Sequence, residues 1–300
     1  MALTKHDRVQ RSSEVASISS AVKTSPEPRT AEEMYLDLLK RSLTRALFAK
    51  RHERHTLKPG RLLRRSLHAF VRRALAPLRL ELVRVVRSGP EDYVESGHEA
   101  GNRVEDAETM LGTLQLDQMQ FCITDVCDRG IPGDLLEAGV WRGGMTVFMR
   151  GVLKARGDNL RRVWVADSFS GLPDHDSALD SFGWKPGDMA VSLEEVKSNF
   201  ARYGLLDDQV VFVKGFFADT LPHASISTLS VLRLDADLYE STRDVLNFLY
   251  PKVSIGGYAI FDDYQNLKDC RKAVDEYRQA HGISDPIINI DSRAVFWRKT

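Results

Sequence analysis

Residues 134–144 read DLLEAGVWRGG, a short apolar run followed by a turn that carries three glycines. The run has the length and composition of a buried β-strand, and the residues after the turn, 145–154, suit a helix. Glycines let a ligand approach the backbone, and the amino terminus of a helix presents amide groups that have no partner within the helix. The stretch therefore predicts a strand that ends at a ligand-binding turn.

Four further runs have the same strand-like composition and are separated by stretches of helical length. They are VWVADSF at 163–169, QVVFVKG at 209–215, LSVLRLDAD at 229–237 and GGYAIFDD at 256–263. Alternation of strands and helices predicts an α/β fold with a doubly wound, mostly parallel sheet. The final DPIINIDSRAVFWRKT at 285–300 predicts two more strands joined by a hairpin, which gives the sheet an antiparallel edge.

The amino-terminal part of the chain has a different composition. Residues 1–30 are rich in Ser, Lys, Glu and Pro, and we expect them to form a disordered tail. A helix is expected to begin at Thr30, because Glu33 completes a capping box. We assign residues 31–130 to a helical extension with a lid and residues 131–300 to the main α/β domain.

Residues 40–87 are strongly basic, with fifteen Lys and Arg against two acidic residues. Within them, apolar residues recur at helical spacing from Leu63 to Leu78 and predict a basic amphipathic helix. Such a helix could bind an anionic membrane surface or an acidic partner. Because Pro77 interrupts any long helix lying on a membrane, we favour a solvated basic face on a packed helix.

The overall composition limits the function classes. The chain has 300 residues and a formal net charge of zero at pH 7, which argues against a general affinity for nucleic acid. Its three cysteines give neither a disulfide framework nor the spacing of zinc ligands. We find no apolar export signal and no run of eighteen apolar residues, so we expect a cytoplasmic protein without a membrane span.

Asp167 ends the second predicted strand, about thirty residues after the glycine turn, where an acidic side chain can accept hydrogen bonds from both ribose hydroxyls of a nucleoside. The glycine spacing is G-x-x-x-G-G. It differs from the G-x-G-x-x-G of dinucleotide sites and lacks the G-K-[ST] of a phosphate loop. These features predict a nucleoside cofactor, with NAD and S-adenosylmethionine both open at this point.

Two pairs of acidic residues follow the next strands. Asp235 and Asp237 end the fourth predicted strand, and Asp262 and Asp263 end the fifth. Neighbouring strand ends would bring these carboxylates together at one rim, which is unfavourable unless a cation neutralises them. We therefore predict a site for an oxygen-preferring ion such as Mg²⁺ on Asp235, Asp262 and Asp263. Asp237 directly precedes a helix, so it is a ligand of this site, a substrate contact or a helix cap.

Seven blocks of the chain, in order, resemble the macrocin O-methyltransferase family, whose members methylate sugar hydroxyls in macrolide and aminocoumarin antibiotic pathways. The blocks are ETM at 108–110, QFCITDV at 120–126, PGDLLEAGVWRGG at 132–144, DSFSGLP at 167–173, NFARYGLLDDQVVFVKGFFADTLP at 199–222, LRLDADLYESTRDVLNFLYPK at 232–252 and GGYAIFDDYQ at 256–265. The resemblance extends over about residues 32–297. The chain departs from the family pattern at Ala138, where Thr is usual, at Ala236, where Gly is usual, and in a longer stretch at 51–102.

The resemblance implies a class I methyltransferase fold and an enzyme of secondary metabolism that transfers a methyl group from S-adenosylmethionine to a small-molecule, glycoside-like acceptor. It implies that residues 131–300 form the catalytic domain and that the helix at 34–47 forms a homodimer. It also implies that Mg²⁺ on Asp235, Asp262 and Asp263 binds the acceptor oxygens, and we assign Asp235 as the base. The residues implied in cofactor binding are Thr109, Met110, Glu137, Gly139, Val140, Trp141, Arg142, Asp167, Ser168, Gly215 and Phe216, with Glu108 beside them.

Other interpretations remain open from the sequence. The block at 172–194, which holds Phe182 and Trp184, is either a mobile lid over the acceptor or an ordinary surface loop. His175 and His223 would be the bases of a metal-independent transfer. A methyltransferase-like binding module, docked through the basic residues, is an alternative from another class. A nicotinamide oxidoreductase is disfavoured by the glycine spacing and by the lack of a placed Tyr-x-x-x-Lys.

Overall fold

The structure is a computed structural model of the chain, and it describes residues 30–48, 50–54, 77, 83–87, 107–176 and 182–300. The predicted tail, apart from Thr30, and the predicted basic helix, apart from Pro77, lie outside these residues. At the end of the basic stretch, β2 (Val83–Arg87) pairs antiparallel with β1 (Lys50–Arg54). This pairing was not predicted.

A seven-stranded sheet forms the centre of the fold, with the strand order β5-β4-β3-β6-β7-β9-β8. The strands β5, β4, β3, β6 and β7 run parallel, and β9 runs antiparallel to both β7 and β8. Their bounds are β3 (Asp134–Ala138), β4 (Val163–Asp167), β5 (Val210–Lys214), β6 (Leu229–Leu234), β7 (Val253–Phe261), β8 (Ile288–Asn289) and β9 (Val295–Arg298). The five predicted strands, the doubly wound sheet and its antiparallel edge are confirmed.

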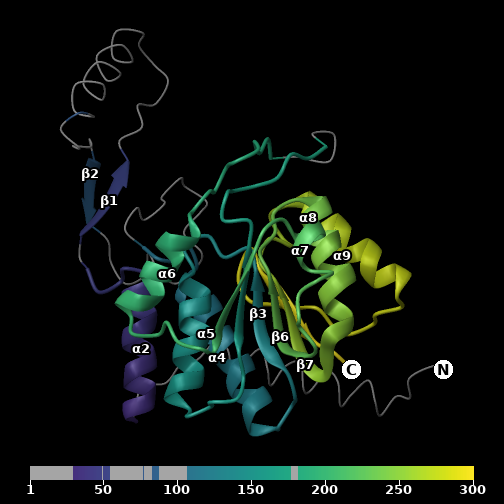
Figure 1. Cartoon of the computed structure of the whole chain (residues 1–300), viewed down its shortest axis with the longest axis horizontal. Helices are drawn as coiled ribbons and strands as arrows, with labels where there is room; N and C mark the ends of the chain where they lie inside the picture. Colours follow the sequence, from purple (N-terminus) through teal and green to yellow (C-terminus); the bar gives the residue numbers. More distant parts are fainter. Residues whose placement is uncertain (1–29, 49, 55–76, 78–82, 88–106, 177–181) are drawn as a thin grey trace.

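Helices cover both faces of the sheet (Figure 1). One layer contains α2 (Ala31–Leu43), α4 (Thr113–Asp128), α5 (Gly144–Ala155) and α6 (Leu193–Arg202). The other contains α8 (Tyr239–Leu249) and α9 (Lys268–Ala280), with the short α7 (Phe217–Thr220) near α8. Among the described helices, none combines the length and the apolar composition needed to cross a membrane.

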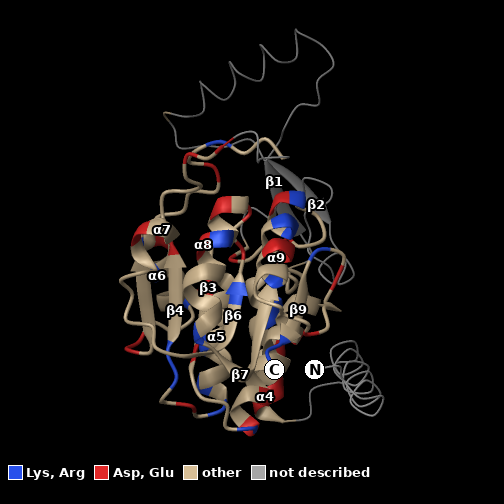
Figure 2. Cartoon of the chain, turned by 90° about the vertical axis from the view of Figure 1, so that its right-hand side faces the viewer, with Lys and Arg blue, Asp and Glu red and all other residues tan. Residues whose placement is uncertain are grey.

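The central strands explain why two helical layers are needed. All six residues of β6 are buried, so apolar side chains point to both faces of the sheet and both faces must be covered. One buried apolar cluster includes Phe148 of α5 and Phe200 of α6, and a second includes Leu246 of α8 and Val274 of α9. Figure 2 shows the result, with the central strands mainly tan and the charged residues concentrated on helices and loops.

The strand order fixes where a ligand can bind. After β3 the chain continues outward to β4 and β5, and it then returns to β6 on the other side of β3. The loops after β3 and β6 therefore leave in different directions and open a crevice at the carboxyl ends of the strands. The glycine turn, Asp167 and the acidic pairs all follow strands at this edge of the sheet.

Helix α2 packs into the main core. Thr30 caps it as predicted: the Glu33 N–H donates to Thr30 Oγ1 at 3.1 Å, and the Thr30 N–H donates to Glu33 Oε2 at 2.9 Å. Leu36, Leu39 and Leu43 are buried in the cluster that also holds the apolar residues of α5. The amino-terminal extension is thus packed against the layer that supports the glycine turn.

We predict that Leu43→Ala lowers the free energy of unfolding by about 2–4 kcal/mol, because it removes a fully buried side chain from this core. Leu160→Ala is the matched control, since Leu160 is 92% exposed, and it should change the free energy by less than about 0.5 kcal/mol. Urea unfolding measures both variants. Equal effects of the two substitutions would contradict the packing of α2 on the core.

Candidate active site

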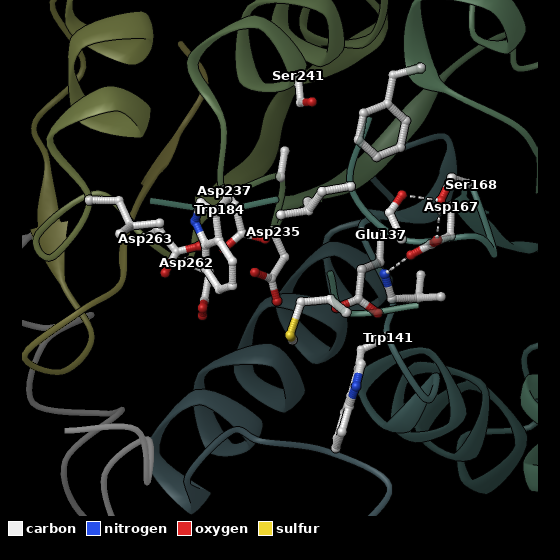
Figure 3. Close-up of a pocket in the computed structure, with 18 of the residues that line it drawn as sticks. Glu137, Trp141, Asp167, Ser168, Trp184, Asp235, Asp237, Ser241, Asp262 and Asp263 are labelled. Carbon is white, nitrogen blue, oxygen red and sulfur yellow. Dashed lines mark hydrogen bonds between the residues drawn. The ribbon is translucent and has the colours of Figure 1, made fainter. Parts of the chain in front are cut away.

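A cavity of about 490 Å³ lies at the carboxyl ends of β3, β4, β6 and β7 (Figure 3). The glycine turn, the segment 108–111, the loop after β4 and the start of α8 form its walls. Most of the site residues predicted from the sequence line it, namely Thr109, Met110, Glu137, Gly139, Val140, Trp141, Asp167, Ser168, Phe216, Asp235, Asp262 and Asp263, together with Glu108. Two predicted residues, Arg142 and Gly215, do not line it.

The glycine turn is built by a close approach between backbones. Gly139 has φ 86°, and a Cβ at this position would lie 1.8 Å from the Asp235 carbonyl oxygen, so only glycine fits. The Gly139 N–H donates to the Ala166 carbonyl at 2.9 Å, and the Asp235 N–H donates to the Ala138 carbonyl at 2.8 Å. The turn thus holds the ends of β3, β4 and β6 together at the cavity.

Asp167 connects the end of β4 to this turn. Its Oδ2 accepts from the Val140 N–H at 2.8 Å, and its Oδ1 accepts from the Phe169 N–H at 2.7 Å. Burial raises the pKa of Asp167, although these backbone hydrogen bonds oppose the rise. The Ser168 hydroxyl also lies 3.4 Å from Oδ1. Because a carboxylate has about four lone-pair sites, acceptor capacity for a ligand remains.

The segment with Glu108, Thr109 and Met110 is fixed from two sides. The Glu108 N–H donates to the Leu43 carbonyl of α2 at 3.2 Å, and the Gly144 N–H donates to the Glu108 carbonyl at 3.0 Å. A Cβ on Gly144 would lie 2.4 Å from that carbonyl oxygen. The second glycine of the Gly-Gly pair therefore serves close packing of this segment.

Arg142 supports the turn from outside the cavity. Its Nη1 donates to the Ala107 carbonyl at 3.0 Å, and its guanidinium lies 4.4 Å from the centre of the Trp141 ring. The backbone carbonyl of Arg142 accepts from Asn199 Nδ2 at 2.8 Å. Arg142 therefore links the glycine turn to the segment before Glu108 and to α6.

Arg233 on β6 is a site residue that was not predicted. It is fully buried, and its Nη1 donates to Glu137 Oε1 at 2.6 Å and to Asp235 Oδ2 at 2.9 Å. Its Nη2 donates to Asp262 Oδ1 at 2.6 Å and to Gln115 Oε1 at 3.1 Å. Burial alone would lower the pKa of Arg233, but the charges of Asp262, Asp235 and Glu137 outweigh burial and raise it. The signal in the sequence is a lone arginine inside the apolar run LSVLRL, since a buried charge needs partners.

Three aspartates converge beside this network. Asp235, Asp237 and Asp263 each place a carboxylate oxygen within 4.8 Å of the others. Asp263 Oδ1 accepts from Arg293 Nη2 at 2.8 Å, whereas Asp263 Oδ2 is buried and has no hydrogen-bond partner among the described residues. A group of hard oxygen donors that contains a buried, unpartnered carboxylate oxygen fits a divalent cation such as Mg²⁺.

This cluster differs in one member from the predicted set. Asp262 lines the cavity, but its Oδ1 is bound by Arg233, and Asp237 occupies the third position of the cluster. Asp237 has φ 54°, and the cap of α8 is Leu238, which makes no side-chain cap bond. Asp237 is therefore not the cap of α8, which was one of its three interpretations.

The carboxyl groups at the cavity floor resist ionisation. Burial and the charge of Asp235 raise the pKa of Asp262 to about 6, and burial and the charge of Asp262 raise the pKa of Asp263 to about 8. Burial also raises the pKa of Glu137 to about 8, against the opposing effect of Arg233. Burial is the main cause of these shifts, and repulsion among the carboxylates adds to it; a bound cation would offset both.

Two aromatic residues from the predicted lid also line the cavity. Phe182 and Trp184 stack with their ring centres 4.5 Å apart, and Trp184 Nε1 is buried without a hydrogen-bond partner in the described part of the chain. His175 and His223 do not line the cavity, and His175 Nδ1 lies 3.1 Å from the Pro173 carbonyl oxygen. The geometry disfavours both histidines as bases.

Comparison with known proteins gives a family and near relatives. Residues 32–299 match the macrocin O-methyltransferase (TylF) family. A mycinamicin III 3''-O-methyltransferase from Micromonospora griseorubida is 42% identical over 281 residues, which cover 91% of this chain and 99% of that protein. An 8-demethyl-8-(2,3-dimethoxy-alpha-L-rhamnosyl)-tetracenomycin-C 4'-O-methyltransferase from Streptomyces olivaceus is 53% identical over 203 residues, which cover 65% of this chain and 76% of that protein.

A solved structure agrees with this assignment. The O-methyltransferase NovP is 39% identical, superposes with a TM-score of 0.72, and covers 90% of this chain and 99% of its own. The family match includes every described residue that lines the cavity, from Glu108 to Arg293. The resemblance noted in the sequence is thus confirmed, and the chain belongs to the macrocin O-methyltransferase family.

Proposed function

We propose that the chain is an S-adenosylmethionine-dependent and Mg²⁺-dependent O-methyltransferase that acts on a sugar hydroxyl of a small-molecule secondary metabolite. Family membership supports methyl transfer to oxygen, and one relative is named for a rhamnosyl-bearing tetracenomycin. The observation that carries the metal part is the buried, unpartnered Asp263 Oδ2 within the group of three aspartates. A cavity of about 490 Å³ has the size of a small-molecule site.

We assign the cofactor to the side of the cavity that the glycine turn and Asp167 form. Asp167 would accept hydrogen bonds from the ribose hydroxyls, and Phe216 at the cap of α7 would contact the adenine. Thr109 and Met110, which are fixed by the contacts of Glu108, would cover the bound cofactor. The exclusion of water there protects the sulfonium and strengthens the surrounding electrostatic interactions.

The acceptor is assigned to the acidic side of the cavity. Mg²⁺ held there would act as a Lewis acid and lower the pKa of a sugar hydroxyl. Asp235 is the proposed base, because its carboxylate belongs to the cluster and is fixed by Arg233 Nη1 at 2.9 Å. Phe182 and Trp184 would exclude water above the acceptor. The transfer then requires the hydroxyl oxygen to face the methyl group in line, which binding both reactants in one cavity favours.

The alternative functions account for fewer of the observations. A binding module docked through the basic residues does not explain why three aspartates cluster beside a cavity. A metal-independent transfer would need a base near the cofactor, and neither His175 nor His223 lines the cavity. A metal-dependent transferase accounts for both the aspartate cluster and the cavity.

We also propose that the chain forms a homodimer through α2. Met34 and Leu38 on this helix are 60% and 55% exposed, and Tyr35 beside them is 37% exposed, so an apolar face remains on the outside of a helix that is otherwise packed. A second copy of the chain would cover this face. Light scattering should report a dimer for the full chain and a monomer for the double variant Met34→Glu, Leu38→Glu. A monomeric full chain would contradict the proposal.

Asp167→Ala should weaken S-adenosylmethionine binding by about 1.5–3 kcal/mol, because a buried ribose would lose its carboxylate acceptor. Asp158→Ala is the matched control. Asp158 also accepts two backbone amides, those of Leu160 and Arg161 at 3.0 Å each, but it precedes β4 and does not line the cavity. Calorimetry should therefore find the affinity reduced only in the Asp167 variant. Unchanged affinity in that variant would remove Asp167 from the cofactor site.

EDTA should abolish methyl transfer, and added Mg²⁺ should restore it. Asp237→Asn and Asp263→Asn should each lower turnover at least about a hundredfold with partial rescue at high Mg²⁺, whereas Asp235→Asn should lower it further without rescue. Because the pKa of Asp263 is about 8, protons compete with the cation at lower pH, and the half-saturating Mg²⁺ concentration should rise about fivefold from pH 8 to pH 7.

Asp275→Asn is the control for these aspartate variants. Asp275 lies on α9 outside the cavity, and its carboxylate accepts a hydrogen bond from the Tyr264 hydroxyl. Its turnover should stay within about twofold of the unmodified chain. Normal turnover in EDTA would show that the metal mechanism is wrong. Nearly full activity of Asp235→Asn would show instead that another group takes the proton.

A further inference from the structure

We propose that Arg233 is a positioning residue that joins the cofactor side and the metal side of the cavity into one unit. The inference rests on the proposed function and extends it to a residue that touches neither reactant. Arg233 lies inside β6, and its guanidinium reaches carboxylates from three different strands. Glu137 belongs to β3, Asp235 follows β6, and Asp262 follows β7.

One end of the guanidinium already spans the two sides of the site, and the other end extends the contact to a second strand end and to α4. Nη1 binds Glu137 beside the glycine turn and also Asp235, while Nη2 binds Asp262 and Gln115 of α4. Figure 3 shows Glu137 between Asp235 and Asp167, which is where the cofactor side meets the acidic side. A displacement of the guanidinium would therefore move groups on both sides together.

The contacts of Arg233 leave one carboxylate oxygen of Glu137 for a ligand. Arg233 binds one oxygen of Glu137, and the other, Oε2, is buried without a hydrogen-bond partner among the residues that the structure describes. Glu137 lines the cavity, so this oxygen is oriented by Arg233 for a hydrogen-bond partner from outside the chain. Asp235 is bound by Arg233 in the same way and belongs to the aspartate cluster.

Stability alone does not account for an arginine at this position. A buried ion network often contributes less to stability than apolar side chains of similar volume, because each charge must be removed from water. The neighbouring residues of β6 are apolar and fully packed, so an apolar side chain would suit the strand. A planar guanidinium reaches all three carboxylates at once, with Nη1 on Glu137 and Asp235 and Nη2 on Asp262.

The test compares Arg233→Lys with Arg150→Lys. Arg150 on α5 is also buried and forms a forked pair with Asp207, with Nε–Oδ1 and Nη2–Oδ2 distances of 2.9 and 2.8 Å, but it does not line the cavity. Calorimetry should find S-adenosylmethionine and Mg²⁺ each bound about tenfold more weakly by the Arg233 variant, because one ammonium cannot replace both nitrogens that together hold Glu137, Asp235 and Asp262. The Arg150 variant should bind both as the unmodified chain does, whatever its loss of thermal stability.

Gln115→Met is the milder variant if Arg233→Lys does not fold. It removes one neutral acceptor of Nη2, together with the hydrogen bond from Gln115 Nε2 to Asp291, and keeps all carboxylates. It should weaken the binding of both ligands about threefold. A folded Arg233 variant that binds both ligands normally would overturn the inference, and so would normal binding by Gln115→Met when Arg233→Lys is unfolded. Equal losses in the Arg150 variant would overturn it as well. An unmodified chain that binds neither ligand would overturn the proposed function and this inference together.

Discussion

Repulsion among carboxylates at the ends of β3, β6 and β7 is the constraint on which the site depends. Parallel strands end at the same edge of a sheet, so acidic residues in these positions are forced together by the fold itself. The buried guanidinium of Arg233 neutralises part of this charge by binding Glu137, Asp235 and Asp262. Because carboxylates still outnumber guanidinium groups there, the remaining charge favours a divalent cation.

The same edge of the sheet brings a cofactor side within reach of the acidic side. Gly139 allows β3 to approach the Asp235 carbonyl, and Asp167 holds the turn through the Val140 amide. The segment at Glu108 is then fixed against α2 and α5. A methyl donor and a metal-bound hydroxyl could therefore meet in one enclosed space, and the rigidity of these backbone contacts would keep their separation constant.

The sequence predicts most of the sheet and less of the site. The strands are recognisable because each is a compact apolar run that ends in Gly or Asp, whereas β1 reads KRHER and has no apolar alternation. Arg233 was missed because its partners Glu137, Gln115 and Asp262 are 96, 118 and 29 residues away in the chain. The position of Asp237 depends on a left-handed backbone, which the spacing D-A-D does not reveal.

The central claim is that the aspartates at the strand ends hold a divalent cation within reach of the cofactor. The most direct test is anomalous diffraction from crystals grown with S-adenosylhomocysteine and Mn²⁺. The account predicts an anomalous peak within bonding distance of Asp263 Oδ2 and of the Asp235 carboxylate, with Arg233 still bound to Glu137 and Asp262. Density for the cofactor product without a peak at these aspartates would contradict it.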